Sequence, residues 1–300
     1  MSDNILDIIS NIVPKENIKT KEELKKHTTF RIGGYADFFV SPGSEEEAAL
    51  LIKTLNENNI KYYVLGNGSN VLAPDDGYKG VIIYIGGKLS KIEINNNEID
   101  VEAGALLSKT AKEAYKSSLT GMEFAAGIPG SVGGAVVMNA GAYGGEIKDI
   151  IISARVCDNK GNILSLTKEE LDLSYRHSVI EEKSYTVLSC KFLLTKGKQE
   201  EIKEQMDELS RRRREKQPLE YPSAGSTFKR PEGYFAGKLI EDAGLKGYTV
   251  GGAQVSAKHS GFVINTGNAT ADDVKQLIKN VSEEVYKQFG VCIEPEVKIL

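Results

Sequence analysis

The sequence predicts an α+β protein, because strand patterns dominate its middle region while helical patterns occupy separate segments. Residues 36–65 read as strand, helix and strand, with ADFFV and KYYVL on either side of an amphipathic segment. Strand-like runs then follow one another over residues 81–194, separated by turns such as Gly86-Gly87. Long helical patterns return only after residue 198. A doubly wound sheet would need strands and helices in regular alternation, so we do not expect one.

The first half of the chain begins with a predicted helical arm over residues 1–26, where short apolar groups alternate with Lys and Glu. Ser44 followed by three glutamates is a typical helix start, and that helix ends at about Asn58. A further helix is expected over about 106–118. The expected strands of this half are 36–40, 61–65, 81–85, 90–94 and 98–102.

In the second half, the longest predicted helix starts at Thr270, a suitable N-cap, and ends at Phe289 before Gly290. Residues 291–300 read as a terminal strand. The other expected elements are strands at 150–158, 162–166 and 185–194 and helices at 198–217 and 236–244.

Composition narrows the class of protein. The net charge of −4 provides no basic field that would attract nucleic acid or an anionic membrane. Three cysteines without CxxC spacing argue against a disulfide framework, and neither they nor the three histidines show the spacing of metal ligands. The N-terminus lacks the pattern of a signal peptide, and no segment has the character of a membrane span. We expect a cytoplasmic protein without metal, membrane or nucleic-acid partners.

A glycine-rich stretch covers residues 121–145, GMEFAAGIPGSVGGAVVMNAGAYGG. It holds eight glycines, and Glu123 is its only charge. A flexible linker rarely carries so many apolar residues between its glycines. Because ordering glycines costs conformational entropy, they need a compensating reason. Close packing of the backbone is one such reason, and a flat ligand lying against the backbone is another; the residues alone leave both open.

A second glycine-rich loop, VLGNGSNVL over residues 64–72, follows a predicted strand. Its centre, GNGSN at residues 66–70, presents successive backbone N–H groups with little obstruction, an arrangement that binds phosphate oxygens. The GxGxxG fingerprint is broken because position 71 is valine, and no GxxxxGK[ST] pattern is present. An ordinary glycine turn is the alternative.

Three short segments carry residues suited to catalysis. Arg176 lies in SYRHS, Ser226 follows a glycine in PSAGSTFKRP, and the terminal EPEV places a carboxylate pair at Glu294 and Glu296. Ser226 is outside the GxSxG pattern of an acyl-transfer serine. The alternatives are a structural arginine, a turn serine and a solvated strand edge. The arginine run 211–214 equally fits a solvated helix end or a contact with a phosphate-bearing ligand.

Taken in order along the chain, these segments resemble the UDP-N-acetylenolpyruvoylglucosamine reductase family. The matching motifs are TTFRIGG from Thr28, GNGSN, GIPGSVGGAVVMNAGAYGGEI, SYRHS, PSAGSTFKRP, KHSGFVIN and EPEV. They cover about residues 21–297, and seven motifs in one order are highly specific. Longer members of the family carry an inserted, tyrosine-bearing loop that closes over the substrate. This chain has no room for that loop and resembles the shorter, type II form.

The resemblance implies a two-part FAD-binding region of the vanillyl-alcohol-oxidase type and a C-terminal α+β substrate-binding domain. We expect residues 1–80 and 81–200 to form the two FAD-binding subdomains. Residues 201–292 would form the substrate-binding domain, and the C-terminal strand, 293–300, can return to the first subdomain.

The resemblance also implies an activity, the NADPH-dependent, FAD-mediated reduction of UDP-N-acetylglucosamine enolpyruvate to UDP-N-acetylmuramate in peptidoglycan precursor synthesis. FAD would be bound noncovalently, with NADPH as the hydride donor. Arg176, Ser226 and Glu296 match the family's catalytic residues. Arg176 would stabilise an enolate, Ser226 would protonate C2, and Glu296 would lie near the substrate carboxylate. Strand alternation puts Glu294 on the same face, but Glu296 matches the family's Glu-Val pair.

Two groups of residues are expected to hold FAD on the strength of the resemblance. The backbone amides of residues 66–70 would hold the pyrophosphate, and the stretch 121–145 would line the isoalloxazine. The expected cofactor-binding residues are Gly66, Asn67, Gly68, Ser69, Asn70, Gly127, Ile128, Pro129, Gly130, Ser131, Gly133, Gly134, Asn139, Ala140 and Gly141. The candidates for substrate binding are Tyr175, Lys229, Tyr221 and Arg230.

Two other functions stay open. One is another oxidase or dehydrogenase of the same flavoprotein fold. Many such enzymes attach flavin covalently through His or Cys, and neither residue occurs in the stretch 121–145. The other is a non-catalytic flavin- or nucleotide-binding module, which needs no proton donor. We expect a monomer whose partners are the enolpyruvyl substrate and NADPH.

Overall fold

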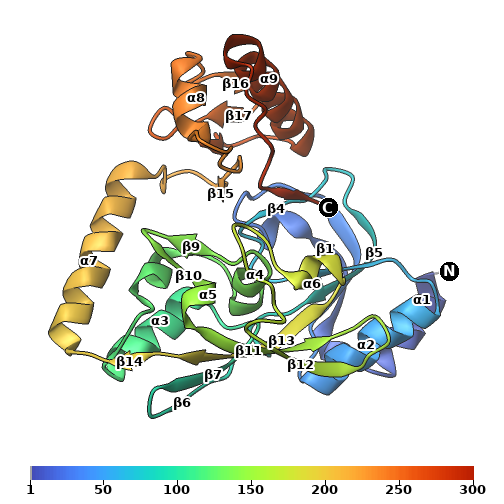
Figure 1. The fold of residues 1–300 in the computed structure, drawn as a ribbon. Helices are drawn as coiled ribbons and strands as arrows, with labels where there is room; N and C mark the ends of the chain where they lie inside the picture. Colours follow the sequence, from blue (N-terminus) through green and yellow to red (C-terminus); the bar gives the residue numbers. More distant parts are fainter. Residues whose placement is uncertain (1) are drawn as a thin grey trace. The chain divides into compact units, whose positions relative to one another are not determined.

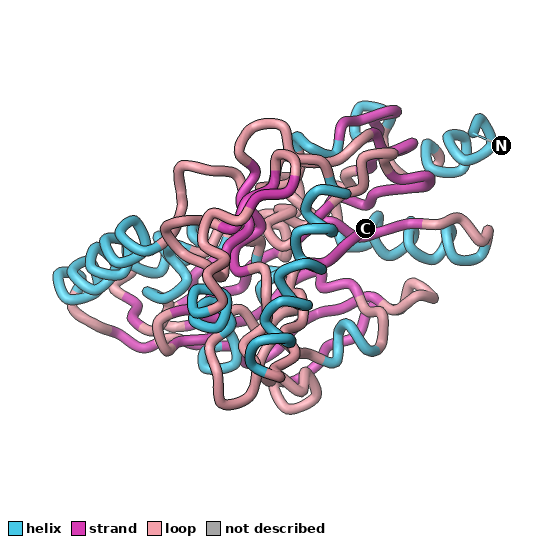
Figure 2. Tube along the Cα trace, turned by 90° about the horizontal axis from the view of Figure 1, so that it is seen from above, coloured by secondary structure: helices cyan, strands magenta, loops and turns pink. Residues whose placement is uncertain are grey.

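The computed structural model describes residues 2–300, which form two compact units. Both units mix helices, strands and long connecting loops (Figure 2), and the predicted α+β class is confirmed. The division into residues 1–80, 81–200 and 201–292 stays a prediction. Unit 1 consists of Met1–Thr20, Asp37–Asn67 and Gly80–Arg211, and unit 2 consists of Lys21–Ala36, Gly68–Lys79 and Arg212–Leu300.

A four-stranded sheet lies mostly in unit 1, and its strands in spatial order are β1 (Ile18–Glu23), β2 (Tyr35–Val40), β5 (Tyr78–Tyr84) and β3 (Tyr62–Leu65). β3 and β5 run parallel. Between β2 and β3 in sequence lies the helix α2 (Glu45–Glu57), whose buried face belongs to the core of unit 1. The predicted N-cap is confirmed, because the Ser44 hydroxyl accepts a 3.1 Å hydrogen bond from the backbone N–H of Glu47.

The helical arm predicted over residues 1–26 is wrong beyond its first part; residue 1 itself lies outside the described residues. The chain forms the helix α1 (Ser2–Ser10), the short 3₁₀ turns η1 (Lys15–Asn17) and η2 (Leu24–Lys26), and between these turns the strand β1. The segment IKTKEE is mostly polar and has no clear period. The conformation of this segment is therefore decided by its pairing with β2 at the edge of a sheet and not by its local sequence pattern.

Unit 1 also contains an antiparallel five-stranded sheet (Figure 1). In spatial order its strands are β12 (Ile163–Thr167), β11 (Ile151–Cys157), β13 (Thr186–Leu193), β7 (Glu98–Glu102) and β6 (Ile92–Asn95). The strands predicted between residues 90 and 194 agree with these bounds to within two residues.

Shorter elements complete unit 1. They are the helices α3 (Leu107–Lys116), α4 (Val132–Val137), α5 (Ile147–Ile150) and α6 (Val179–Glu182), the 3₁₀ helix η3 (Glu123–Gly127), and the strand pairs β8 (Leu119–Thr120) with β14 (Thr195–Lys196) and β9 (Gly141–Ala142) with β10 (Gly145–Glu146). The predicted helix 198–217 is confirmed as α7 (Gln199–Lys216), which begins in unit 1 and ends in unit 2.

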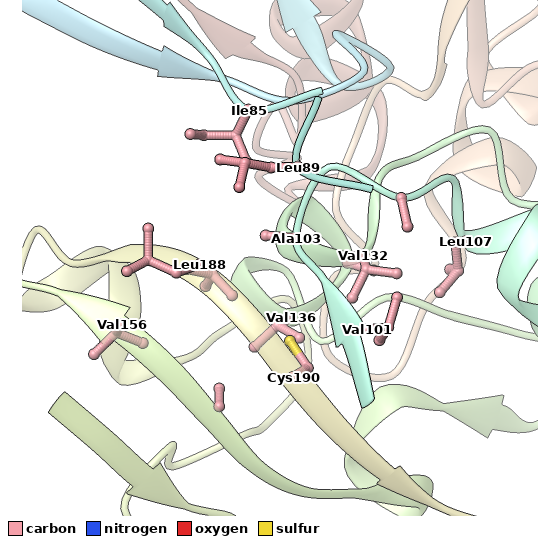
Figure 3. Close-up of a cluster of buried hydrophobic side chains, with 14 of the residues drawn as sticks. Ile85, Leu89, Val101, Ala103, Leu107, Val132, Val136, Val156, Leu188 and Cys190 are labelled. Carbon is pink, nitrogen blue, oxygen red and sulfur yellow. The ribbon is translucent and has the colours of Figure 1, made fainter. Parts of the chain in front are cut away.

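The core of unit 1 joins the short helix α4 to the five-stranded sheet. Figure 3 shows Val132 and Val136 of α4 gathered with Val101 of β7 and Cys190 of β13. All four side chains are buried. Burying an aliphatic side chain of this size contributes about 1.5–3 kcal/mol, so this contact fixes α4 on the sheet. The glycine-rich stretch that contains α4 is therefore part of a packed core and is not a linker.

Unit 2 contains an antiparallel sheet that the sequence pattern missed. Its strands in spatial order are β15 (Ser223–Ser226), β18 (Phe262–Asn265), β17 (Ala253–Val255) and β16 (Thr249–Val250). Each has only two to four residues, which is too few to display alternation. The terminal strand is also shorter than predicted: β19 (Lys298–Ile299) pairs in parallel with β4 (Val71–Leu72).

Two helices, α8 (Ala236–Asp242) and α9 (Ala271–Phe289), supply much of the core of unit 2. The predicted ends of α9 are confirmed. Thr270 and Asp273 form a capping box, and Gly290 ends the helix at a φ of 68°. Of the helices in residues 2–300, none is both long and apolar enough to cross a membrane.

Candidate active site

The loop after β3 lies directly against the glycine-rich stretch within unit 1. Asn67 Nδ2 donates a hydrogen bond to the carbonyl of Pro129. A Cβ at Gly66 would collide with the Ser131 hydroxyl, so a larger residue here would displace that hydroxyl. The predicted cofactor-binding residues Gly66, Asn67, Pro129 and Ser131 therefore meet at one place, although they are more than sixty residues apart in sequence.

The segment that carries these residues is held on the end of β7. The backbone N–H of Val132 donates to Ala105 at 2.8 Å, and that of Gly133 donates to Ala103 at 2.8 Å. A Cβ at Gly133 would lie 2.8 Å from the Ala103 Cβ. Close packing therefore explains Gly133. The predicted residues around it, Ile128 and Gly130, lie at the end of η3 and beside Leu107, whose N–H donates to Gly130 at 3.0 Å.

Other glycines of the stretch also have packing reasons. A Cβ at Gly145 would lie 2.6 Å from the Phe124 ring, and one at Gly141 would lie 2.8 Å from the Gly145 carbonyl. The only charge of the stretch, on Glu123, is buried and accepts hydrogen bonds from the Thr120 hydroxyl at 2.7 Å and the Gly121 N–H at 2.8 Å.

Gly134 is a glycine that neither packing nor backbone conformation explains. It lies inside α4, is exposed, and has an ordinary helical φ; an added Cβ would meet only its own cap, the Ser131 hydroxyl, at 3.4 Å. Glycine inside a helix costs about 1 kcal/mol relative to alanine. A ligand lying against this backbone accounts for that cost. The residues present therefore fit a flat cofactor at the exposed side of α4.

The second half of the GNGSN loop belongs to unit 2 and is tied to the end of the chain. Gly68 has a φ of 59°, and a Cβ there would collide with the His27 carbonyl, so both conformation and space require glycine. Ser69 is half-buried. Asn70 Nδ2 donates to the carbonyl of Glu296 at 3.1 Å, and the Asn70 carbonyl accepts from Lys298 N at 3.0 Å.

Arg176 sits at the tip of a tight turn in unit 1. Ser174 and His177 exchange both of their backbone hydrogen bonds, each 3.2 Å, so Tyr175 and Arg176 are the two central residues. Arg176 has a φ of 54°, in a region where glycine and asparagine are usual. Its guanidinium carbon lies 5.1 Å from the centre of the Tyr175 ring, which is itself about half exposed. The turn therefore places the side chains of these two predicted site residues next to each other.

Ser226 and Glu296 lie on neighbouring segments of unit 2. Ser226 ends β15 just after Gly225, whose φ of 74° accompanies a shift in the pairing of β15 with β18. Ser226 is exposed, whereas the next residue, Thr227, is fully buried. The backbone N–H of Glu296 donates to the Thr227 carbonyl at 2.7 Å. This bond brings the predicted proton donor and the predicted carboxylate to the same edge.

Thr227 holds this edge in register, a role that the sequence did not reveal. Its hydroxyl accepts from the backbone N–H of Val263 at 2.9 Å, and its own N–H donates to the Gly261 carbonyl at 2.8 Å. A threonine beside a serine carries no signal for such a role in the sequence.

The two carboxylates of the EPEV segment have different surroundings. Glu294 is exposed and its carboxylate lies 3.3 Å from Lys229 Nζ. Glu296 is half-buried. Lys229, which is predicted to bind the substrate, therefore forms an ion pair with Glu294. Of the two acids, Glu296 is the one beside Ser226, which supports the choice of Glu296.

The remaining candidates for substrate binding lie at the surface of unit 2. Tyr221 is 44% exposed. The Arg230 guanidinium stacks over the Phe235 ring at 4.0 Å, and its Nε donates to the Tyr234 carbonyl at 3.3 Å. This stacking pre-orders Arg230 while leaving Phe235 exposed.

The cysteines do not suggest covalent attachment of a cofactor. Cys157 and Cys190 are free and buried in unit 1, and burial raises the pKa of the Cys157 thiol to about 11. Burial also raises the pKa of Cys190, so neither forms a thiolate at neutral pH. Cys292 is free and exposed. Over residues 2–300, no group of three or more His, Cys, Asp or Glu side chains is arranged to hold a metal ion.

Comparison with known proteins gives two family matches. A model described as the FAD binding domain matches residues 36–167. A model described as the C-terminal domain of UDP-N-acetylenolpyruvoylglucosamine reductase matches residues 217–300.

Curated relatives of the same name match over their full length. The UDP-N-acetylenolpyruvoylglucosamine reductase of Clostridium novyi is 56% identical over 97% of this chain and 95% of its own. The corresponding protein of Clostridioides difficile is 51% identical over 97% of this chain and 95% of its own.

Solved structures of similar fold include a protein of the same name. The crystal structure of UDP-N-acetylenolpyruvylglucosamine reductase from Thermus caldophilus has a TM-score of 0.82 at 35% identity, covering 94% of this chain and 99% of that one. The glucose dehydrogenase Phl p 4.0202 matches with a TM-score of 0.53 at 14% identity, over 65% of this chain and 44% of its own. That second likeness concerns the fold alone.

Proposed function

Because this chain belongs to the UDP-N-acetylenolpyruvoylglucosamine reductase family, we propose that Arg176, Ser226 and Glu296 carry out the substrate half of its reaction. The chain is an FAD-containing oxidoreductase. It reduces the enolpyruvyl group of UDP-N-acetylglucosamine enolpyruvate with NADPH, which gives UDP-N-acetylmuramate for peptidoglycan synthesis.

The chemistry that FAD would supply when bound is hydride transfer from NADPH to the enolpyruvyl group. Gly66, Asn67, Pro129, Ser131 and Gly134 would hold the cofactor through their backbone and small side chains. Because Gly66 and Gly134 carry no side chain, their backbone can approach the cofactor closely.

Arg176 stabilises the charge that develops on the substrate. Addition of hydride to C3 leaves negative charge at C2, which spreads into the neighbouring carboxylate. A guanidinium presents two parallel N–H donors that match the two oxygens of such a group. Preorganised donors aimed at developing charge contribute about 2.7–4 kcal/mol each in known cases. The position of Arg176 suits this role, since it is only partly buried at the tip of its turn.

Ser226 donates the proton that C2 requires. A serine hydroxyl is a weak acid, but a carbanionic carbon is a strong base, so a positioned hydroxyl is sufficient. Ser226 is exposed at the end of β15, where a ligand can reach its hydroxyl. Glu296 then contacts the substrate carboxylate from the same edge. The observation that carries this assignment is the 2.7 Å bond from Glu296 N to the carbonyl next to Ser226.

The substrate's nucleotide would be bound by exposed polar and aromatic groups. Tyr175, Tyr221, Lys229 and Arg230 are the candidates, and the stacking of Arg230 on Phe235 fixes the place of the guanidinium. We propose further that the enzyme works in the cytoplasm as a monomer, and that its product supports cell shape and division. Light scattering tests the oligomeric state and should give a mass near 32.7 kDa.

The test separates the two half-reactions by stopped-flow absorbance of the flavin. NADPH should bleach the bound flavin of the wild-type protein, and the enolpyruvyl substrate should restore its colour. Ser226→Ala should leave the first step intact and slow the second by ~10²-fold or more, as expected for a lost general acid. Ser223→Ala, on the same strand, is the matched control and should slow neither step.

Failure of either step has a defined meaning. If NADPH cannot bleach the flavin, the chain is an oxidase of the same fold or a binding module. If Ser226→Ala restores the colour at the wild-type rate, Ser226 is not the proton donor.

A further inference from the structure

We propose that Asn139, assisted by Ser178, is a positioning residue that holds the turn of Arg176 in its reactive orientation. The proposal rests on the proposed function of Arg176. It gives the glycine-rich stretch a second task besides cofactor binding, because Asn139 belongs to that stretch while Arg176 lies 37 residues further on.

The Arg176 turn needs external support. A non-glycine residue in the left-handed region costs roughly 1–2 kcal/mol, and Arg176 adopts a φ of 54°. Such a conformation persists only where its surroundings impose it. The two 3.2 Å bonds between Ser174 and His177 close the turn, but both are internal to it. Something else must fix the turn on the rest of unit 1.

Asn139 supplies the first anchor. It follows α4 with a φ of 40°, and its N–H and that of Ala140 return to Val136 at 3.1 Å and Ala135 at 2.8 Å. This is the Schellman arrangement that ends many helices, with asparagine in the place of glycine. The backbone of Asn139 is therefore fixed on a helix that the core holds firmly.

The side chain of Asn139 then reaches across to the turn. It is fully buried, and its Nδ2 donates to the Ser174 carbonyl at 3.0 Å and to Glu146 Oε2 at 2.7 Å. Its Oδ1 accepts from the backbone N–H of Lys148 at 2.9 Å, which settles the orientation of the amide. Both donors and the acceptor are thus used inside the protein. An asparagine employed in this way acts on the turn through its side chain.

Ser178 supplies the second anchor on the other side of Arg176. Its side chain is fully buried, and its hydroxyl donates to the carbonyl of Val137 at 2.7 Å. Although Ser178 occupies the N-cap position of α6, its hydroxyl does not cap that helix. It instead satisfies a carbonyl in the last turn of α4, which lacks an intrahelical partner. α4 and α6 lie side by side as a result (Figure 1).

The two anchors enclose the arginine. Ser174 and Ser178 lie two residues before and two residues after Arg176, and both bind the end of α4. The guanidinium must meet a small, planar group, and an error of 1 Å in such a contact can reduce the rate about 10²-fold. Loss of one anchor leaves the turn free to relax toward an unstrained φ, which moves the guanidinium. The effect should fall on the substrate half-reaction, in which Arg176 acts.

Asn139→Gly is the variant of choice, because glycine tolerates the positive φ while removing all three side-chain bonds. We expect kcat to fall about ten-fold or more with KM within about three-fold, since Arg176 acts mainly on charge that develops in the transition state. Asn139 is among the expected cofactor-binding residues, but its amide is buried and bonded to Glu146, Ser174 and Lys148. FAD content and bleaching by NADPH should therefore stay at the wild-type level. Glu146→Gln, which alters the other partner of Asn139 Nδ2 without touching Ser174, is the matched control and should stay within two-fold in kcat.

Loss of FAD or of NADPH bleaching in Asn139→Gly would overturn the proposal, since Asn139 would then serve the cofactor. An unchanged kcat would overturn it as well. Ser178→Ala carries the same test if Asn139→Gly does not fold, and should lower kcat with the cofactor retained. Arg176→Ala is measured beside these variants. If Arg176→Ala keeps full activity, the proposed function fails. If Arg176→Ala is inactive while Asn139→Gly is fully active, only the positioning role of Asn139 is contradicted.

Discussion

The two units hold their predicted catalytic residues in different ways. In unit 1, Arg176 stands in a strained turn that two side chains, Asn139 and Ser178, tie to the end of α4. In unit 2, Ser226 and Glu296 lie on extended segments whose backbones are bonded directly, through the Thr227 carbonyl. A side-chain tie can be removed by one substitution, while a backbone bond survives substitution of the residues that it joins. We therefore expect the arginine to be the more easily misplaced of the two groups.

Removal of the arginine itself should have the largest effect. Arg176→Ala should slow the return of flavin colour by substrate by ~10²–10³-fold, the range seen when a preorganised donor to developing charge is lost. Arg176→Lys should recover only part of that loss, because an ammonium is a point charge without the planar fork. Rapid-mixing kinetics with pre-bleached enzyme measure both. An alanine variant at the wild-type rate contradicts the role of Arg176.

The two carboxylates of the EPEV segment offer a matched pair. Glu296→Gln should slow the substrate step by about ten-fold or more, because the half-buried acid lies beside Ser226 and loses its charge or its proton. Glu294→Gln should change it by less than two-fold, since an exposed ion pair with Lys229 contributes little. Steady-state kinetics of the two variants test this prediction. If Glu294→Gln lowers the rate more than Glu296→Gln does, Glu294 is the acid that contacts the substrate.

Thr227 tests the backbone-held edge through stability. Thr227→Val keeps the shape of the side chain but leaves the Val263 N–H without its buried acceptor, which costs about 1–3 kcal/mol. Thr227→Ser keeps the hydroxyl and should lose less. Denaturant unfolding followed by circular dichroism gives the free energies. Equal stability of the valine variant and the wild type would show that the hydroxyl does not hold β18 in place.

Asn70 should show only a small effect on rate. Asn70→Ala removes the 3.1 Å bond to the Glu296 carbonyl, but the backbone bonds from Glu296 N to Thr227 and from Lys298 N to Asn70 both remain. We expect a loss of less than five-fold in the substrate step, well below that of Asn139→Gly. A larger loss for Asn70→Ala than for Asn139→Gly would invert the comparison between the two units.

Much of the fold could be predicted from sequence where an element is long enough to repeat its pattern. The helix at 271–289 shows both caps and an apolar stripe, and strands such as β13 alternate over six of their residues, Leu188–Leu193. The sheet of unit 2 could not be predicted, because strands of two to four residues leave no period to detect. The sequence predicts a helix where the structure has the strand β1. The conformation of β1 depends on its pairing with β2, a tertiary contact that the local sequence does not show.

The candidate site divides in the same way. The resemblance to the family supplies Arg176, Ser226 and Glu296 as candidates, and their residue types suit the reaction. The motifs do not reveal that Gly133 serves packing while Gly134 has no packing reason, since this depends on where Ala103 lies. Nor do they link Asn139 with Ser174, because only the folded chain brings these residues together. Residues 121–145 carry little charge because most of them are buried or half-buried, and the one charge, on Glu123, accepts hydrogen bonds from Thr120 and Gly121.

A double-mutant cycle on the substrate half-reaction tests the central claim most directly. The rate constant for restoring flavin colour is measured in the wild type, Asn139→Gly, Arg176→Ala and the double variant. If Asn139 acts through Arg176, introducing Asn139→Gly into the wild type should lower this rate constant about ten-fold or more. Introducing it into the Arg176→Ala protein should lower the rate constant by less than two-fold. The same factor in both backgrounds would contradict the account, because Asn139 would then act independently of the arginine.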